Sequence, residues 1–424
     1  MSSNNFSLAS QYEVGTVTID GNDVAGLYQM ISVFENLSSP VITGSITLLD
    51  TDGSDFIYKH DIEGSEEIEF EFTNAKGDTV EFKGVLNGLR NKTSAVNRTV
   101  YTFDFTSEQV RKNEETFIVK RFKGSPKEIV EEMIEKIGGE TDKIDGEGLP
   151  MNFLGSRKRP TDIIRHVITH GVTQEGKSSA TAKDKEREET TKGTTGFLCW
   201  QTLGGYRFNS VDNILKGEGG EDIGELSYTL QNKGKPVEET METIFEYDFK
   251  QIGDIQTKMR SGAFRSINVS FDIDKGLYKE YTYDDEKNMT DKQKEAVTVP
   301  TRFMFRPYTP EVFDNTCKKA QENKWDQSRR HLQQNTVRQN TFADQFGNFT
   351  LPPRFDIKAG DTFTAKIPKV ESEKGGGYNE KHSGKYVISQ VGHHFMNDGR
   401  AYTKVQTVRS TIQQDEYSAE QWIT

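Results

Sequence analysis

The sequence predicts an α+β, mainly β protein: two similar antiparallel β-barrel or β-sandwich domains with inserted α/β domains. Residues 12–110 alternate apolar and polar side chains in short runs separated by turn residues, which is typical of strands with one buried face. A comparable order of strand motifs returns near the C-terminus, and helical patterns lie between the two regions. At 424 residues, a prior of roughly 150 residues per domain suggests about three domains.

The N-terminal region contains several strand-like runs. They are residues 14–19, 42–49, 68–72, 80–89 and 100–105. In the third run the apolar side chains face one way, while Glu67, Glu69 and Glu71 face the other. We therefore expect a sheet that covers a core on one face and meets water or a lumen on the other.

The clearest helix spans residues 125–138. Ser125 is a candidate N-cap, Pro126 suits the first helical position, and Glu128 completes a capping box. Apolar side chains then recur at helical spacing until two glycines end the pattern. A second helix is expected at residues 161–170.

The remaining elements follow in order. Residues 173–195 carry almost no apolar side chain and predict a mobile loop. A glycine pair between residues 197–200 and 206–208 predicts a hairpin. A short α/β segment is expected at 240–300, a helix at about 311–331, and a polar tail at 411–424. Further strands are expected at 332–342, 346–351, 361–367, 384–395 and 401–410.

Three short motifs recur in the same order in the two strand-rich regions. Each region contains a Gly-Asp-Thr triplet, then a glycine-led strand, then a Tyr-Thr strand. The motifs begin at Gly77, Gly84 and Tyr101 in the first region and at Gly360, Gly384 and Tyr402 in the second. Such motifs also occur by chance, but their matched order favours duplication of a β-domain.

These elements suggest a domain plan. The first β-domain covers residues 1–110 and is completed by about 196–240. An inserted α/β domain covers 111–195, and a second small α/β domain covers 241–310. The second β-domain covers 311–410, and the tail covers 411–424.

Composition narrows the class of protein. Lys and Arg total 54 against 66 Asp and Glu, so the net charge of −12 disfavours wrapping of nucleic acid. Cys199 and Cys317 form no CxxC pair, which favours assembly in a reducing cytoplasm. We expect no signal peptide and no membrane span, because neither a basic-plus-apolar N-terminus nor a run of about 18 apolar residues is present.

Two histidine pairs are the most tempting candidate sites. His166 and His170 share one helix face and could hold a zinc ion, but Val167 stands where a zinc protease needs its glutamate base. His393 and His394 lie in one strand, so their rings should point to opposite faces. We favour packing roles for both pairs.

The other reactive groups also favour structural readings. Cys199 lies in an apolar run and should be buried and inert. Glu66 and Glu67 beside Glu69 and Glu71 are expected to form a solvated or lumen-facing row rather than an acid/base pair. Phosphate loops, dinucleotide fingerprints and nucleophile elbows are lacking in the sequence. We therefore expect a non-enzyme with no catalytic, cofactor-binding or metal-binding residues and no cofactor.

Several segments together resemble a known family. They are 43–50 (TGSITLLD), 62–70 (IEGSEEIEF), 105–108 (FTSE), 159–164 (RPTDII), 196–200 (GFLCW), 205–212 (GYRFNSVD), 384–388 (GKYVI), 393–395 (HHF) and 402–409 (YTKVQTVR). Their order resembles the baseplate central hub of contractile-tailed, T-even-type phages, which is related to the N-terminal part of VgrG spike proteins. Residues 173–195 and the tail after Arg409 show no resemblance.

The resemblance implies a structural subunit of a viral tail. Each chain would supply two similar tube domains, so a homotrimer would form a pseudo-sixfold ring in the virion baseplate, assembled in the host cytoplasm. The ring would join the tail tube protein to the central spike protein, with tape-measure and baseplate wedge proteins as further candidate partners. DNA would cross the lumen during genome ejection without specific binding or contact with a membrane, helped by acidic strand faces.

Three alternatives remain open. A hub or spike component of a type VI or extracellular contractile injection system belongs to the same class. A zinc-dependent hydrolase would use His166 and His170, and a receptor-binding adhesin would recognise host cells.

Overall fold

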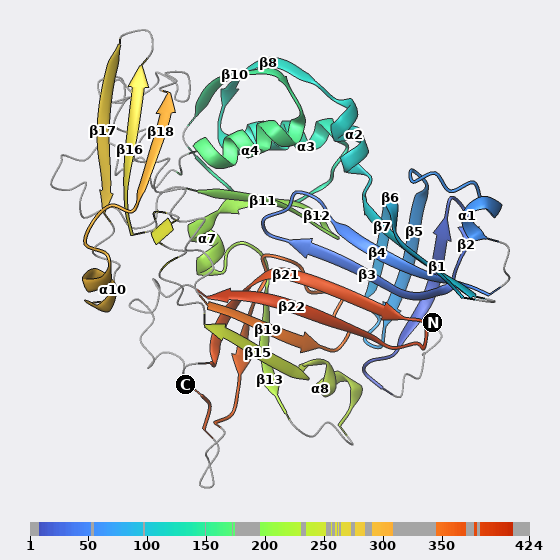
Figure 1. Ribbon diagram of the computed structural model, residues 1–424. Helices are drawn as coiled ribbons and strands as arrows, with labels where there is room; N and C mark the ends of the chain where they lie inside the picture. Colours follow the sequence, from blue (N-terminus) through green and yellow to red (C-terminus); the bar gives the residue numbers. More distant parts are fainter. Residues whose placement is uncertain are drawn as a thin grey trace.

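The computed structural model describes most of the chain and is mainly β (Figure 1). The described residues are 8–51, 55–95, 98–148, 150–171, 173, 196–229, 235–251, 256, 259–260, 262, 264–272, 276–284, 291–307, 345–369, 377–379 and 382–409. The expected loop at 173–195, apart from Thr173, lies outside them, as do the helix at 311–331, the strand at 332–342, Cys317 and the tail at 411–424.

The first β-domain holds the N-terminal strands. They are β1 (Tyr12–Ile19), β2 (Asn22–Asp23), β3 (Tyr28–Asn36), β4 (Thr43–Asp50), β5 (Glu67–Asn74), β6 (Thr79–Ala95) and β7 (Arg98–Ser107), with the short helix α1 (Phe56–Lys59). Among the longer strands of this domain, β3 is the one that the sequence patterns did not single out, and the short elements β2 and α1 were not predicted either. The expected alternation of the third run is confirmed, because Ile68, Phe70 and Phe72 are buried on one face.

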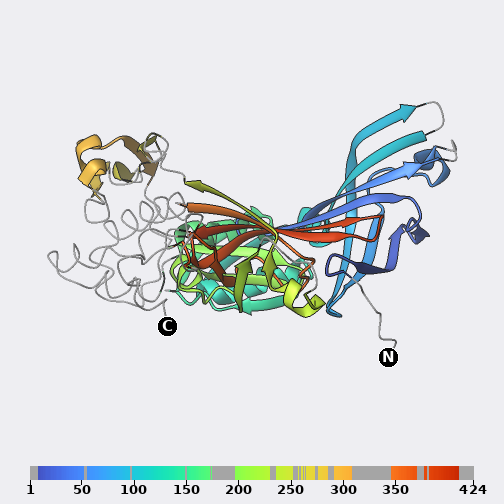
Figure 2. The same cartoon turned by 90° about the horizontal axis from the view of Figure 1, so that it is seen from below.

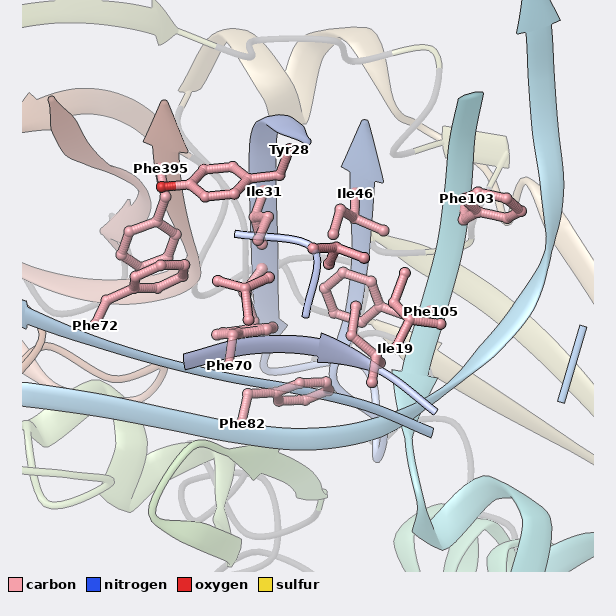
Figure 3. Packing of buried hydrophobic residues seen from close by; sticks show 14 of the residues in the cluster. Ile19, Tyr28, Ile31, Ile46, Phe70, Phe72, Phe82, Phe103, Phe105 and Phe395 are labelled. Atoms are coloured by element: carbon pink, nitrogen blue, oxygen red, sulfur yellow. The ribbon is translucent and has the colours of Figure 1, made fainter. Parts of the chain in front are cut away.

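Aromatic side chains fill the core of this domain (Figure 3). The rings of Phe70 and Phe82 stack with centroids 5.1 Å apart. Phe72 stacks at 4.2 Å on Phe395, which lies 323 positions later in the chain (395 − 72). Such contacts add to the burial of apolar area, and they bind the C-terminal strands to the N-terminal core.

The second β-domain is assembled from the second half of the chain. Its strands are β13 (Asp222–Tyr228), β14 (Thr243–Ile244), β15 (Glu246–Gln251), β19 (Gln345–Leu351), β20 (Thr362–Lys366), β21 (Gly384–Met396) and β22 (Ala401–Arg409), with helix α8 (Val237–Met241). A separate aromatic and aliphatic cluster around Trp200, Phe349 and Tyr386 forms its core.

The two β-domains have the same strand order. Neighbouring strands run β3-β4-β7-β6-β5-β1 in the first domain and β15-β19-β22-β21-β20-β13 in the second. Taken in chain order, the six strands of each domain occupy the same places. They differ in one pairing, since β13 runs parallel to β20 whereas β1 runs antiparallel to β5.

The likeness extends to the register. Strand β6 bulges between Leu86 and Gly88, directly after its last pair with β5, and β21 bulges between Ile388 and Gln390, directly after its last pair with β20. Asp104 of β7 pairs with Ser45 on one side and with Gly88 on the other. Gln406 of β22 holds the equivalent position and pairs with Asn348 and Gln390. The run 44–48 (GSITL) thereby matches 347–351 (GNFTL). Two similar β-domains are thus confirmed.

The repeated sequence motifs indicated the duplication, but they aligned the two β-domains wrongly. Gly77-Asp78-Thr79 leads into β6, whereas Gly360-Asp361-Thr362 leads into β20, and these strands are not equivalent. The glycine-led motifs (β6 and β21) and the Tyr-Thr motifs (β7 and β22) do lie in equivalent strands, but out of register. Turn motifs recur at many strand starts, so they do not fix the alignment of a repeat.

A single mixed sheet joins both domains, and a closed barrel does not form. Among the described residues, one path of paired strands runs from β2 to β14, and a branch from β21 through β22 and β19 ends at β15. Alternating side chains predict a one-sided sheet, but closure depends on strand tilt and stagger, which local patterns do not set.

The inserted α/β domain lies between the two repeats. Its elements are α2 (Gln109–Glu115), β8 (Ile118–Gly124), α3 (Pro126–Lys136), β9 (Thr141–Ile144), β10 (Met151–Lys158), α4 (Pro160–His170), β11 (Phe197–Thr202), β12 (Gly205–Ser210) and α7 (Val211–Lys216). Both expected helices and the hairpin are confirmed. The capping box is present, since Ser125 Oγ accepts from Glu128 N and the Glu128 carboxylate accepts from Ser125 N.

Residues 196–240 differ from the expected completion of the first β-domain. Strand β12 pairs with β9, and Phe197 and Phe208 pack in the core of the inserted domain. Strand β13 pairs with β20 of the second β-domain. A hairpin signal is local, so it does not specify which sheet receives the hairpin.

The second insertion interrupts the second β-domain between β15 and β19. Strands β16 (Arg265–Asp272), β17 (Leu277–Asp284) and β18 (Arg302–Pro307) form a small sheet near helix α10 (Asp291–Ala296). The first part of the small domain expected at 241–310, including β15, therefore belongs to the second β-domain.

Candidate functional site: the junction between the β-domains

The two β-domains meet through backbone pairing of β3 with β21. The pairs run antiparallel from Gln390–Asn36 to Met396–Met30. Strand β21 is long enough to hold β20 with its first part and β3 with its second, along the same edge. This junction makes one sheet of two repeats.

A buried glutamate lies inside the junction. Glu35 of β3 has no exposed surface, and its carboxylate accepts hydrogen bonds from Leu203 N at 2.7 Å and from Ala359 N at 2.8 Å. Burial raises the pKa of Glu35 to about 7, against the opposing effect of these bonds and of Arg207. Glu35 thereby ties the first β-domain to the β11–β12 hairpin and to the second β-domain.

A buried ion pair extends this network. Arg207 Nη1 lies 2.7 Å from Asp361 Oδ1, and Arg207 Nε lies 2.6 Å from Asp142 Oδ2. Asp361 also accepts from Glu221 N and Lys358 N. Desolvation raises the pKa of Asp361, and the Arg207 charge opposes that rise. Because backbone donors and a guanidinium occupy these carboxylates, the network is suited to fixing domain positions rather than to proton transfer.

A cleft of about 790 Å³ opens beside the junction. Its walls come from the β3–β4 loop, from α2 and α4 of the inserted domain, and from β19 and β22 of the second β-domain. Asn36, Ile164 and Gln406 represent the three walls. The cleft therefore marks where all three domains converge.

The structure brings His166 and His170 together on α4. Their rings stack with centroids 4.1 Å apart, and His170 Nδ1 lies 3.0 Å from the His166 carbonyl oxygen. Burial lowers the pKa of His166 to about 4. No cluster of three or more His, Cys, Asp or Glu side chains suited to a metal ion occurs in the described part of the chain. The pair therefore lacks a third ligand there.

His393 and His394 point away from each other, as expected. His393 is buried with Nδ1 3.1 Å from Thr403 Oγ1, while His394 Nδ1 lies 2.9 Å from Ser32 Oγ and its ring stacks on Tyr402 at 4.7 Å. Burial lowers the pKa of each to about 4. His394 thus adds a side-chain contact across the β3–β21 pairing.

Cys199 is buried, and desolvation raises its pKa to about 12. A thiol in that state is a poor nucleophile. The acidic row on β5 is partly neutralised, because Lys83 of β6 pairs with both Glu67 and Glu69. Glu71 and Glu81 lie opposite each other on the same face, so this part of the sheet stays acidic despite Lys83.

Sequence reasoning missed the junction network. The sequence does contain a sign of it, because Glu35 follows Ile31 and Val33 at the alternate positions that face the core of a strand. All three side chains of β3 are buried. The partners Arg207 and Asp361 lie far from Glu35 in sequence, and only tertiary contact identifies them.

Comparison with solved structures finds likenesses at low sequence identity, among them proteins described as tail proteins. The tail protein of prophage MuSo2 from Shewanella oneidensis is 10% identical over 94% of this chain and 98% of that chain, with a TM-score of 0.47. A tail protein from Neisseria meningitidis is 9% identical over 95% and 98%, with a TM-score of 0.48. An Escherichia coli component of the type VI secretion system, described as similar to T4 tail proteins, is 9% identical over 96% and 77%, with a TM-score of 0.41.

At about 10% identity, these likenesses transfer no residue's role to this chain. A protein-family model that matches the sequence was not found, and neither was a matching curated protein. None of the helices in the described ranges is both long and apolar enough to cross a membrane.

Proposed function

We propose that this protein is a structural subunit of a phage tail baseplate hub, in which three copies form a pseudo-sixfold ring. The observation that supports this most is the repeated strand order of the two β-domains within one chain. A chain with two equivalent domains lets threefold association present six similar units. The sequence resemblance to the T-even-type hub supports the same function.

The proposed work is mechanical. The ring joins the tail tube to the central spike, and the genome passes through its lumen. Glu67, Glu69 and Glu71 are candidates for the lumen wall, where like charge would limit adsorption of DNA. Screening restricts that effect to about 8–10 Å at physiological salt, and the pairing with Lys83 weakens it further.

Native mass spectrometry of the purified full chain tests the ring. A homotrimer has a mass of roughly 144 kDa, three times 48.1 kDa, and negative-stain images should show a hollow particle. A species that stays monomeric at every concentration, with or without a tail tube protein, contradicts the proposal.

The second candidate within the class is a hub or spike component of a type VI or extracellular contractile injection system. The same duplicated fold would serve there. Location separates the two: the phage hub should co-purify with particles that contain packaged DNA, whereas the injection-system component should occur in particles without a capsid.

A further inference from the structure

The long strands β6 and β21 occupy equivalent places in the repeat, but they differ in the strands that pair with them along one edge. The first part of β21 pairs with β20 and its second part pairs with β3, on the same edge. The first part of β6 likewise pairs with β5, from Thr79 to Val85. Beyond Leu86, the described residues provide β6 with backbone partners from β7 alone. Among the described residues, no strand therefore pairs with the edge that corresponds to the β3 site.

The strand that corresponds to β3 is also half-paired. Strand β15 holds the place of β3 in the repeated order, and it pairs with β19 on one side. On its other side, the described part of the chain offers it no strand. Within the described ranges, each chain thus presents one unpaired acceptor edge on β6 and one unpaired donor edge on β15, which correspond to the two halves of the β3–β21 junction.

One chain cannot join these two edges to each other. Figure 2 shows β6 and β7 projecting as an arm at one end of the molecule, while β15 lies toward the opposite end. Residues 89–95 of the arm are exposed, and Leu89 keeps 43% of its surface accessible. An unpaired strand edge of this kind is a template for pairing with another chain.

We infer that β15 of one copy pairs antiparallel with the outer half of β6 of the next copy, reproducing between chains the β3–β21 junction. The inference rests on the proposed ring and names its interface. Such a contact is heterologous, and its repetition forms a closed ring when the rotation between neighbouring copies closes.

The repeat predicts the register of this interface. His393 of β21 corresponds to Lys92 of β6, because their partners Thr403 and Tyr101 are equivalent in the repeat. In the same way, Val33 of β3 corresponds to Phe249 of β15, because their partners Gly44 and Gly347 are equivalent. Because His393 pairs with Val33, the new pairs are Lys92–Phe249, Thr93–Asp248, Ser94–Tyr247 and Ala95–Glu246.

Disulfide trapping tests that register. The double variant Thr93→Cys with Asp248→Cys is made in the full chain with Cys317→Ser, while buried Cys199 is left in place. Opposed residues in an antiparallel pair lie about 4.5–5.5 Å apart between Cα atoms, within reach of a disulfide. Mild oxidation should convert most of the protein into covalent dimers and trimers, and either single variant should stay largely monomeric in non-reducing gels.

A matched control uses the inner half of the same strand. Glu81→Cys with Asp248→Cys places an exposed thiol where β5 already occupies the edge of β6, so it should give few covalent multimers. Under reducing conditions, far-ultraviolet circular dichroism of every variant should match that of the wild type.

The outcomes separate this inference from the proposed function. Trimers by native mass without trapping in the Thr93/Asp248 variant overturn the strand pairing and leave the hub intact. Efficient trapping into closed rings of another size supports the pairing and overturns the trimer. Equal trapping in the Glu81 control overturns the pairing.

Discussion

At the scale of residues, the β-domain junction depends on a carboxyl group that burial discourages from ionising. The folded-state pKa of Glu35 lies above its ordinary value of 4.5, at about 7. Its contribution to stability is therefore fully present below about pH 4.5 and is lost as the pH rises through about 7. The cost of ionisation at neutral pH is offset by two backbone donors and by Arg207.

Glu35→Gln should change the pH dependence of stability in that window. The wild-type free energy of unfolding should fall by up to about 3 kcal/mol relative to the variant between about pH 4.5 and 7, since one pKa unit corresponds to about 1.4 kcal/mol. Urea unfolding at several pH values measures this difference. Parallel pH profiles for the two proteins would show that Glu35 does not titrate in this range.

Buried histidines should change the free energy of unfolding with pH in the opposite direction. Burial lowers the pKa of His393 to about 4, so its stabilising contribution is present above its ordinary value of 6.5 and is lost as the pH falls through about 4. His393→Asn removes this loss and can retain a hydrogen bond to Thr403.

We expect the wild type to lose about 2–3 kcal/mol more than His393→Asn between pH 7 and pH 4. Thermal unfolding followed by circular dichroism at each pH tests this. The prediction is wrong if the variant is as sensitive to acid as the wild type.

At the scale of elements, local patterns predicted the type of most segments. The capping box at Ser125, the apolar stripe of α3 and the alternation in β5 depend on neighbours within a few residues. Strand β3 was missed because its buried Glu35 breaks the apolar alternation. Partner choice was also missed, since β11 and β12 carry a hairpin signal that is equally compatible with either sheet.

The cap of α3 provides a test at this scale. Ser125→Ala removes the oxygen that accepts from Glu128 N and should lower the free energy of unfolding by about 1 kcal/mol. Glu128→Gln is the matched control, because its amide oxygen can still accept from Ser125 N, and it should stay close to the wild type. Equal losses in both variants would indicate a role of Glu128 beyond the cap.

At the scale of the whole molecule, assembly should be linked to stability. Subunits that bind one another only when folded raise the apparent melting temperature as the protein concentration rises. A hundredfold increase in concentration should therefore shift the melting temperature upward by several degrees in the wild type.

The double variant Glu246→Lys with Asp248→Lys places two lysines in the segment of β15 that is inferred to pair with Ala95 and Thr93 of the next copy. It should weaken the dependence on concentration while the fold of the isolated chain persists. Differential scanning calorimetry across that range measures both proteins. An unchanged dependence in the variant would place the contact between subunits elsewhere.

The sequence by itself determined the mainly β class, the two helices of the inserted domain and the presence of two related β-domains, because each is set by short-range periodicity, capping or repeated motifs. The tertiary structure decided the alignment of the repeats, the pairing of β3 with β21, the open mixed sheet and the buried contacts of Glu35 with Leu203 and Ala359. These features depend on which strand edges meet across hundreds of residues, and local patterns leave that choice of partner free.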